Sequence, residues 1–195
     1  MAKISNSKDF LMLLLYARGH KGKQCEPIRG RTRIMKMVFL FEKEIRRKFN
    51  LDKAISSDIL PDFEPYDFGP FSSQVFSDLE FLIELGLLGV KPVHEEDIFP
   101  EEGIEYDYWQ ASAGIDNSSI GPEYEEDFQL TTLGKQFVQD GEAGSLTKEQ
   151  EKALDEFKAR CTGISLRSLL KYVYTKYPET TTDSKIRKEI SLERY

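Results

Sequence analysis

The sequence predicts a mainly helical (α+β) fold with a small antiparallel β-hairpin and a helical C-terminal extension. One signal is the stretch YDFGPFS at 66–72, a Gly-Pro turn between aromatic residues that an amphipathic helix follows. The second signal is FQLTTLG at 128–134, where an apolar run leads into threonines that can cap a helix. Together the two signals predict the order helix, strand, loop, strand, helix, which is typical of a winged-helix-like module.

Two helices are predicted before the Gly-Pro turn. The first spans Ser5–Arg18, because apolar residues recur there at helical spacing and Gly19 follows. A polar connection over 19–30 leads to a second helix, which Thr32 caps and which ends near Phe49. Residues 51–71 contain three prolines and are predicted to form an ordered loop with one helical turn near 52–56.

The hairpin is predicted to follow a third helix, which Ser72 caps and which ends near Leu85. Its buried stripe consists of Val75, Leu79, Leu82 and Ile83. Strands are predicted at 87–93 and 127–130, with another at 105–111 in the segment between them.

Four further helices are predicted after the hairpin. Thr131 or Thr132 caps the first, Thr147 and Gln150 form a capping box for a helix over 148–161, and Ser165 caps a helix to about Lys176. Pro178 stops that helix, and 185–193 is predicted as a short final helix. The predicted organisation is a domain over 1–140 with an acidic insert at 94–127, and a helical extension over 145–195.

Charge is distributed very unevenly along the chain. The net charge is −7, but segment 94–127 holds twelve acidic residues and no lysine or arginine, and removing those acids leaves +5. Between Arg18 and Lys36, seven cations accompany one acid, Glu26. The sequence is therefore a basic body that carries an acidic insert.

The basic segment is a candidate nucleic-acid contact, because it leads into a predicted helix N-terminus, where backbone N–H groups attract anions. The alternative is a solvated loop, or a surface that pairs with the acidic segment of the same chain. The candidate residues are Arg29, Arg31, Arg33 and Lys36.

The third helix argues against the usual winged-helix docking, in which that helix enters the major groove. No lysine or arginine lies between Gln74 and Val90, and the residues expected to point outward include Asp78, Glu80 and Glu84. The acidic insert, which occupies the hairpin, would also be repelled by phosphate.

The acidic insert is a candidate protein-binding surface, because aromatic anchors beside acidic charge suit a basic partner. The alternative is a solvated loop. The candidate residues are Tyr106, Tyr108, Trp109 and Tyr124.

Catalytic and metal-binding motifs are not found in the sequence. Cys25 and Cys161 lack metal-ligand spacing, His20 and His94 lack partners, and no apolar run approaches the length of a membrane span. The cations around Cys25 are expected to lower the pKa of its thiol. We therefore expect a reduced, cytoplasmic, non-enzymatic protein with no cofactor and no metal.

Short motifs resemble the Panacea (SocA-like antitoxin) domain and its uncharacterised YwgA-like relatives over roughly residues 8–140. A helix of the "KLxKLxYL" kind corresponds to RIMKMVFL at 33–40, and the family's "YGP[FY]S" turn corresponds to the five residues Phe68, Gly69, Pro70, Phe71 and Ser72. The resemblance implies a prokaryotic or phage protein that binds other proteins, such as toxins, and supplies no catalytic residues. The five turn residues are expected to shape the fold.

Two functional hypotheses follow. The first is an antitoxin-like or adaptor-like interaction module that binds a protein partner through its acidic aromatic hairpin. The alternative is a winged-helix-like transcriptional regulator that contacts DNA through the basic segment 18–36. An enzyme or nuclease-associated subunit is a third option, and it would need a carboxylate–metal cluster that the sequence does not locate.

Overall fold

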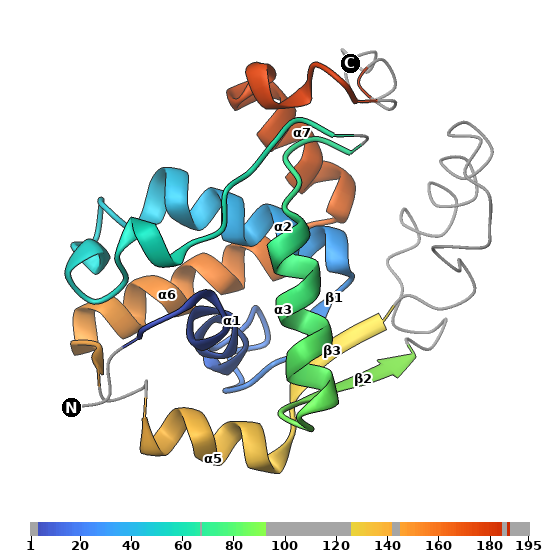
Figure 1. Ribbon diagram of the computed structural model, residues 1–195. Coiled ribbons are helices and arrows are strands. Elements are labelled where there is room, and N and C mark those ends of the chain that lie inside the picture. Colours follow the sequence, from blue (N-terminus) through green and yellow to red (C-terminus); the bar gives the residue numbers. More distant parts are fainter. Residues whose placement is uncertain (1–3, 67, 93–125, 142–144, 185–186, 188–195) are drawn as a thin grey trace.

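The computed structural model describes residues 4–66, 68–92, 126–141, 145–184 and 187 (Figure 1). It confirms the predicted mainly helical α+β class. The helices are α1 (Ser7–Tyr16), α2 (Arg31–Leu40), α3 (Ser73–Glu84), α5 (Thr132–Asp140), α6 (Lys148–Thr162) and α7 (Leu166–Lys176), and the strands are β1 (Ile28–Arg29), β2 (Leu88–Pro92) and β3 (Glu126–Leu130).

The three described strands form one antiparallel sheet in which β3 lies between β1 and β2. The predicted hairpin is β2–β3, and its register pairs Val90 with Phe128. On the other side of β3, Ile28 also pairs with Phe128. The strand β1 was predicted as part of a polar connection, because two residues are too few to show a strand periodicity. Its presence completes the winged-helix order α1, β1, α2, α3, β2, β3.

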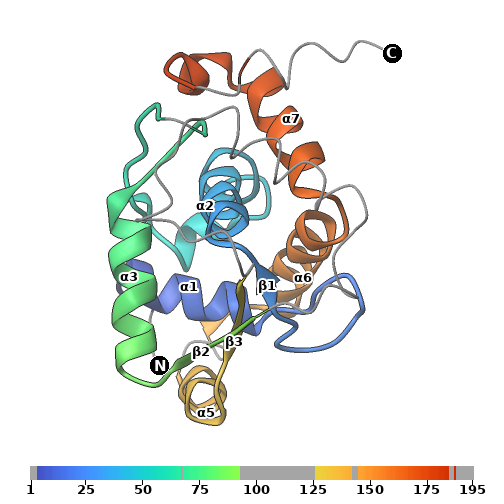
Figure 2. The ribbon, with the colours of Figure 1, turned by 90° about the vertical axis from the view of Figure 1, so that its right-hand side faces the viewer.

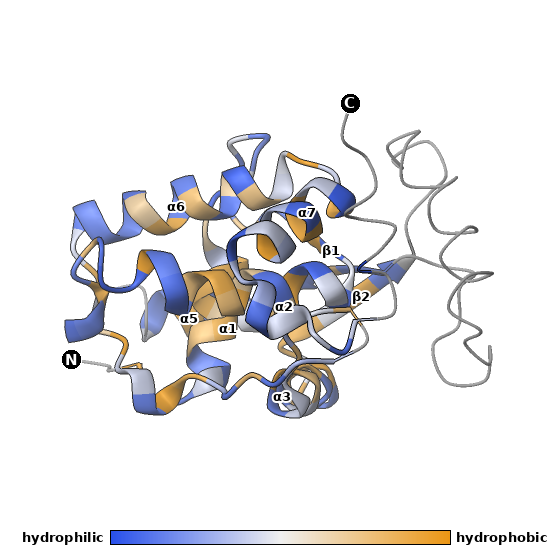
Figure 3. Ribbon diagram, turned by 90° about the horizontal axis from the view of Figure 1, so that it is seen from above, coloured by the Kyte–Doolittle hydropathy of each residue, from blue (hydrophilic) through white to orange (hydrophobic). Residues whose placement is uncertain are grey.

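Helix α1 is the centre of the hydrophobic core. It runs across the middle of the fold between α3 and α6, with α5 beneath it (Figure 2), and it is apolar along most of its length (Figure 3). The consecutive residues 10–15 are all buried, and the ring of Phe10 lies 4.4 Å from that of Phe41, between centroids. One core cluster contains residues of the predicted domain 1–140 and of the extension 145–195, including Phe157 and Leu170.

Helix starts follow the predicted caps at three positions. Thr131 Oγ1 accepts a hydrogen bond from the N–H of Gly134 at 3.1 Å, and Ser165 Oγ accepts one from Ser168 at 3.2 Å. The Thr147–Gln150 capping box is complete, with bonds of 3.3 and 3.0 Å in the two directions. These side chains satisfy backbone N–H groups that have no partner inside the helix.

The second helix differs from its prediction at both ends. Gly30, with φ +78°, holds the N-cap position in place of Thr32, and α2 starts at Arg31. The α-helix ends at Leu40, where a π-helical turn (Phe41–Ile45) replaces it and the N–H of Arg46 donates to the Phe41 carbonyl at 3.0 Å. A periodic apolar pattern does not distinguish a π-helical turn from an α-helical one. Their backbone hydrogen bonds span five and four residues, so the two patterns differ by a single position.

Other predicted boundaries also change. Short 3₁₀ turns occupy Leu51–Lys53 and Ser57–Ile59 within the predicted loop, and another follows α7 at Pro178–Thr181. Ser72 holds the N-cap position of α3 but makes no capping hydrogen bond. The predicted strand at 105–111 lies outside the described residues, as does the predicted final helix apart from Arg187.

The aromatic Gly-Pro turn is the tip of a short hairpin. Glu64 and Phe71 exchange two backbone hydrogen bonds of 2.9 Å, and the N–H of Gly69 donates to the Tyr66 carbonyl at 3.0 Å. Gly69 has φ +81°, and a Cβ atom there would lie 2.9 Å from Tyr174 Cε1 on α7. Glycine is therefore required at 69 by the backbone conformation and by the close approach of α7.

The rest of the motif packs around this tip. The ring of Phe71 lies 4.8 Å from Tyr66 and 5.5 Å from Phe76, between centroids. Phe68 is half-buried against the core, and Pro70 is buried. The motif residues thus shape the junction of the turn, α3 and α7.

We predict that Gly69→Ala lowers the free energy of unfolding by about 2–4 kcal/mol, because it combines a left-handed backbone with a steric clash. Gly22→Ala is the matched control, since Gly22 has φ +72° but open space around the added Cβ. Gly22→Ala should lower the free energy of unfolding by only about 1 kcal/mol. Urea unfolding of both variants measures the difference, and equal losses would show that the Tyr174 contact has no role.

Candidate functional site

The basic segment was the first candidate site, and its two outer arginines are paired with acids. Arg29 Nε lies 3.4 Å from Asp127 Oδ1 on the neighbouring strand. Arg31 Nε lies 3.3 Å from Glu126 Oε2, and its guanidinium also pairs with Glu80 of α3. These ion pairs join the start of α2 to β3 and α3.

Aromatic rings further hold Arg31 in place. Its guanidinium lies over Phe76 at 5.6 Å and over Phe128 at 5.5 Å, measured to the ring centroids. A cation between two rings and two carboxylates is a connector of the fold. Contact with a phosphate would require breaking these interactions.

The two inner cations of the candidate are not on the surface, so the prediction that they contact nucleic acid is wrong for this structure. Arg33 is 3% exposed, and its Nη1 donates to the carbonyls of Cys161 and Ile164, both at 2.7 Å. These carbonyls lie at the end of α6, where backbone acceptors lack partners within the helix. Arg33 thus caps α6.

Lys36 is 2% exposed, and its ammonium donates to the Pro70 carbonyl at 2.8 Å. The contact joins the middle of α2 to the aromatic Gly-Pro turn. Burial lowers the pKa of Lys36 from 10.5 to about 7.

Lys158 is a third buried cation, and the sequence analysis missed it. Its Nζ donates to the carbonyls of Leu15 and Ala17 at 2.7 and 2.8 Å, so it satisfies the C-terminal end of α1. Burial lowers its pKa to about 7, against the raising effect of nearby Cys25 and acidic groups. The only available sequence signal was its position among apolar residues of α6.

The third helix presents acids and apolar side chains to solvent. Glu80, Glu84 and Phe81 are exposed, and none of its residues is a lysine or arginine. Asp78, however, was predicted to face outward and is 3% exposed. Its carboxylate accepts a hydrogen bond from Ser7 and pairs with Lys8 Nζ at 2.9 Å, which fixes α3 to the start of α1.

A polar cluster on α7 and the π-helical turn was not predicted. The Glu44 carboxylate accepts hydrogen bonds from the hydroxyls of Tyr172 at 2.8 Å and Tyr177 at 3.0 Å, and Lys176 Nζ lies 3.1 Å from it. Burial, followed by the bond to Glu44, raises the pKa of Tyr177 to about 12. The phenol is therefore a hydrogen-bond donor that joins α7 to the turn, since a phenolate nucleophile would need a lowered pKa.

The cysteines are also unlike activated nucleophiles. Burial raises the pKa of the Cys25 thiol although Lys135 and Lys158 act to lower it, so the expected lowering is wrong. Burial raises the pKa of Cys161 to about 12. His20 pairs through Nδ1 with Glu26 at 2.8 Å. Within the described residues, no group of three histidine, cysteine or acidic side chains is arranged to hold a metal.

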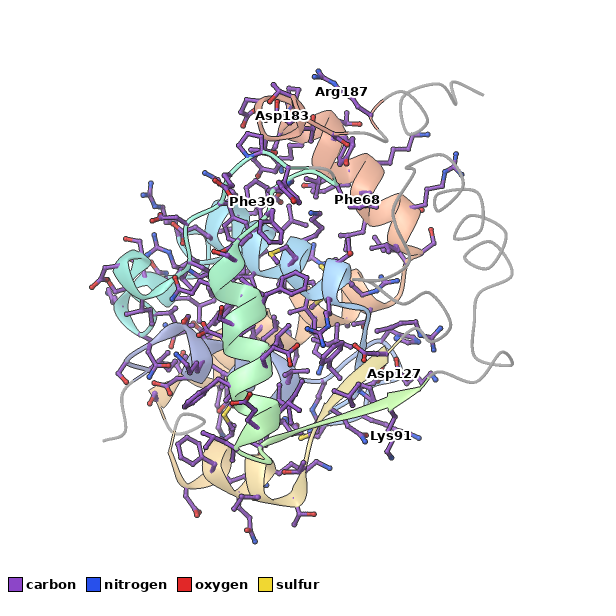
Figure 4. The ribbon with its side chains drawn as sticks, turned by 45° about the vertical axis from the view of Figure 1, so that its right-hand side comes forward. Phe39, Phe68, Lys91, Asp127, Asp183 and Arg187 are labelled. Carbon is purple, nitrogen blue, oxygen red and sulfur yellow. The ribbon has the colours of Figure 1, made fainter. Side chains whose placement is uncertain are left out.

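The aromatic candidates Tyr106, Tyr108, Trp109 and Tyr124 lie outside the described residues. The segment that carries them leaves β2 after Pro92 and rejoins the sheet at Glu126. Figure 4 labels Lys91 and Asp127, which pair in register at this end of the hairpin. The acidic segment therefore starts and ends at the position of the wing in a winged helix.

Comparison of the chain with models of protein families, with curated proteins and with solved structures finds no match. None of the described helices combines the length and apolar character needed to cross a membrane.

We predict that the free energy of unfolding rises between pH 7 and 9. Lys36 and Lys158 have pKa values of about 7 when folded and near 10.5 when unfolded, so the unfolded chain binds more protons in this window. Each lysine contributes roughly 1 kcal/mol per pH unit. Above pH 9 the Cys161 thiol ionises in the unfolded chain but stays protonated in the folded protein, where its pKa is about 12. This difference lowers the free energy of unfolding and opposes the rise.

Urea unfolding at several pH values measures this slope. Lys36→Met should reduce the slope by one lysine's share, and Lys152→Met is the control because that side chain is 77% exposed. A slope that is the same in Lys36→Met and the wild type would contradict the assignment.

Proposed function

We propose that this protein is a non-enzymatic protein-interaction module of the antitoxin or adaptor type, and that its acidic, aromatic segment 94–127 binds a basic protein partner in the cytoplasm. The observation that carries the proposal is that four cations of the basic segment 18–36 make contacts within the fold itself. Arg33 and Lys36 are buried against backbone carbonyls, and Arg29 and Arg31 lie beside carboxylates.

The absence of cations from α3 supports the same proposal. A helix that enters the major groove approaches phosphates on both sides, so cations or neutral donors are favoured on it. The exposed residues of α3 include Glu80 and Glu84 beside the neutral Ser73, Gln74 and Ser77, and none of them is a lysine or arginine. A partner with lysine or arginine on its surface would be attracted to this face and to the acidic segment.

The alternative, a DNA-binding regulator that uses residues 18–36, retains only part of its cationic surface. Arg18, Lys21 and Lys23 are exposed in the loop before β1. Arg18 Nε lies 3.7 Å from Asp155 Oδ2. These three cations provide a weak, salt-sensitive attraction to phosphate but no reading of base sequence. This small cationic surface supports the proposal of a protein partner over the DNA-binding alternative.

We predict that a photo-reactive benzoyl-phenylalanine in place of Tyr108 cross-links to a defined basic protein in cells of the source organism. The same residue in place of Tyr66, which is 50% exposed on the Gly-Pro turn, is the matched control. The cross-linked protein is identified by mass spectrometry, purified and titrated against the wild type.

Replacing Tyr106, Tyr108 and Trp109 together by alanine should weaken that complex by at least about tenfold, because aromatic side chains dominate binding energy at interfaces. Thermal unfolding of the variant should match the wild type. Equal cross-linking from positions 108 and 66, or unchanged affinity of the triple variant, would refute the proposal.

A further inference from the structure

Exposed apolar side chains gather on two helices, α3 and α5. Phe81 and Leu85 are 44% and 51% exposed, and Leu133 and Phe137 are 55% and 49% exposed. Each pair is spaced four residues apart, so both members lie on one side of their helix. Helix α5 has only Gly134 and Val138 buried, so it exposes more apolar surface than its core contact requires.

The two helices meet at the turn that leads into β2. Thr131 Oγ1 donates to the Gly86 carbonyl at 2.7 Å, and the N–H of Thr131 donates to the Leu87 carbonyl at 3.0 Å. A Cβ at Gly134 would collide with the Leu87 carbonyl oxygen, so the first turn of α5 lies directly on this backbone. Leu85 and Leu133 are each within two residues of these contacts.

Contacts with α1 indicate how the two apolar pairs are oriented. On α3, Lys8 Nζ lies 5.2 Å from the ring centroid of Phe81. On α5, Gln139 Nε2 donates to the hydroxyl of Tyr16 at the other end of α1, at 3.3 Å. Because of the 3.6-residue helical period, Leu133 and Phe137 project from the side of α5 opposite Gln139. We define these four side chains as the α3–α5 patch, because the end of α3 lies close to the start of α5 (Figures 1 and 2).

The border of the α3–α5 patch is negatively charged. Glu84 and Asp140 are exposed, and within the described residues neither forms an ion pair. Lys8, which lies over the ring of Phe81, is already paired with Asp78. Lys135 projects from the opposite side of α5.

We propose that the α3–α5 patch is the docking site for an amphipathic helix of a protein partner, with leucine-like side chains on the patch and lysine or arginine beside Glu84 and Asp140. Two apolar pairs on adjoining helices match the i, i+3, i+4, i+7 anchors of a helix bound in this way. A second copy of this chain is a poorer occupant, because two-fold pairing would bring two acidic borders together. The inference rests on the proposed role as a protein-interaction module and adds a second contact surface to it.

The probe is a fluorescein-labelled peptide of about 18 residues with leucine along one helical face and lysine elsewhere, and its matched version has glutamate in place of lysine. Fluorescence anisotropy should show saturable binding of the lysine peptide and at least about tenfold weaker binding of the glutamate peptide. Replacing both Leu133 and Phe137 by serine should weaken binding of the lysine peptide at least about tenfold. Ile164→Ser is the matched control, since Ile164 is 39% exposed outside the patch.

Charge reversal is the second arm. Glu84→Lys together with Asp140→Lys should shift the preference from the lysine peptide to the glutamate peptide. Circular dichroism melting of every variant checks that the fold is retained, which these exposed positions allow.

Three results would overturn the inference. One is binding of the lysine peptide that is unaffected by Leu133→Ser and Phe137→Ser. Another is equal binding of the lysine and glutamate peptides, or no binding of either peptide. The third is a wild-type dimer in sedimentation velocity that the serine variant abolishes, which would assign the patch to a second copy.

The variant with alanine at positions 106, 108 and 109 separates this inference from the proposed function. It should bind the lysine peptide as the wild type does. If it loses the peptide while the Leu133 and Phe137 variant retains it, the acidic segment is the docking surface, and this inference fails while the proposed function stands. Unchanged peptide binding together with a failed cross-link at position 108 refutes the proposed function of the acidic segment alone.

Discussion

Buried cations that donate to backbone carbonyls connect the separate parts of this fold. Lys158 of α6 satisfies the end of α1, Arg33 of α2 satisfies the end of α6, and Lys36 of α2 holds the Gly-Pro turn. The last carbonyls of a helix have no partner within it, and leaving them buried and unpaired costs free energy. A long side chain with several donors can reach two of them from a neighbouring helix.

This use of cations limits what the basic segment can do for function. A cation that caps a helix cannot also contact a phosphate without exposing the carbonyls that it satisfied. Arg29 and Arg31 are held by Asp127, Glu126 and Glu80, and two of these acids belong to the end of the acidic stretch. The basic body and acidic insert seen in the sequence are therefore coupled in part by direct pairing.

The sequence was sufficient for features that depend on neighbouring residues. Capping threonines and serines, the turn at Gly69 and the hairpin strands are local, so a short window contains their cause. The burial of Arg33 could not be predicted in the same way, because its acceptors lie near residue 161 and only the packing of α6 on α2 brings them close. Asp78 was assigned to the wrong face for the same reason, since Lys8 and Ser7 determine its position. The strand β1 exists only because β3 pairs with it.

The hydrogen bond from Lys36 to the Pro70 carbonyl joins α2 to the Gly-Pro turn. It also shows how a basic sequence signal can belong to the interior of a protein. The remaining candidate surfaces, the acidic segment and the corner of α3 and α5, suit a protein partner of opposite charge.

The most direct test of this account is a fluorescence-anisotropy titration of the protein with random duplex DNA at low and at physiological salt. The account predicts weak or no binding at physiological salt, and at low salt no loss of binding when Arg29 is replaced by glutamine, because that side chain lies against Asp127. Tight binding with a steep salt dependence, reduced by Arg29→Gln, would contradict the account and would restore the DNA-binding regulator as the leading function.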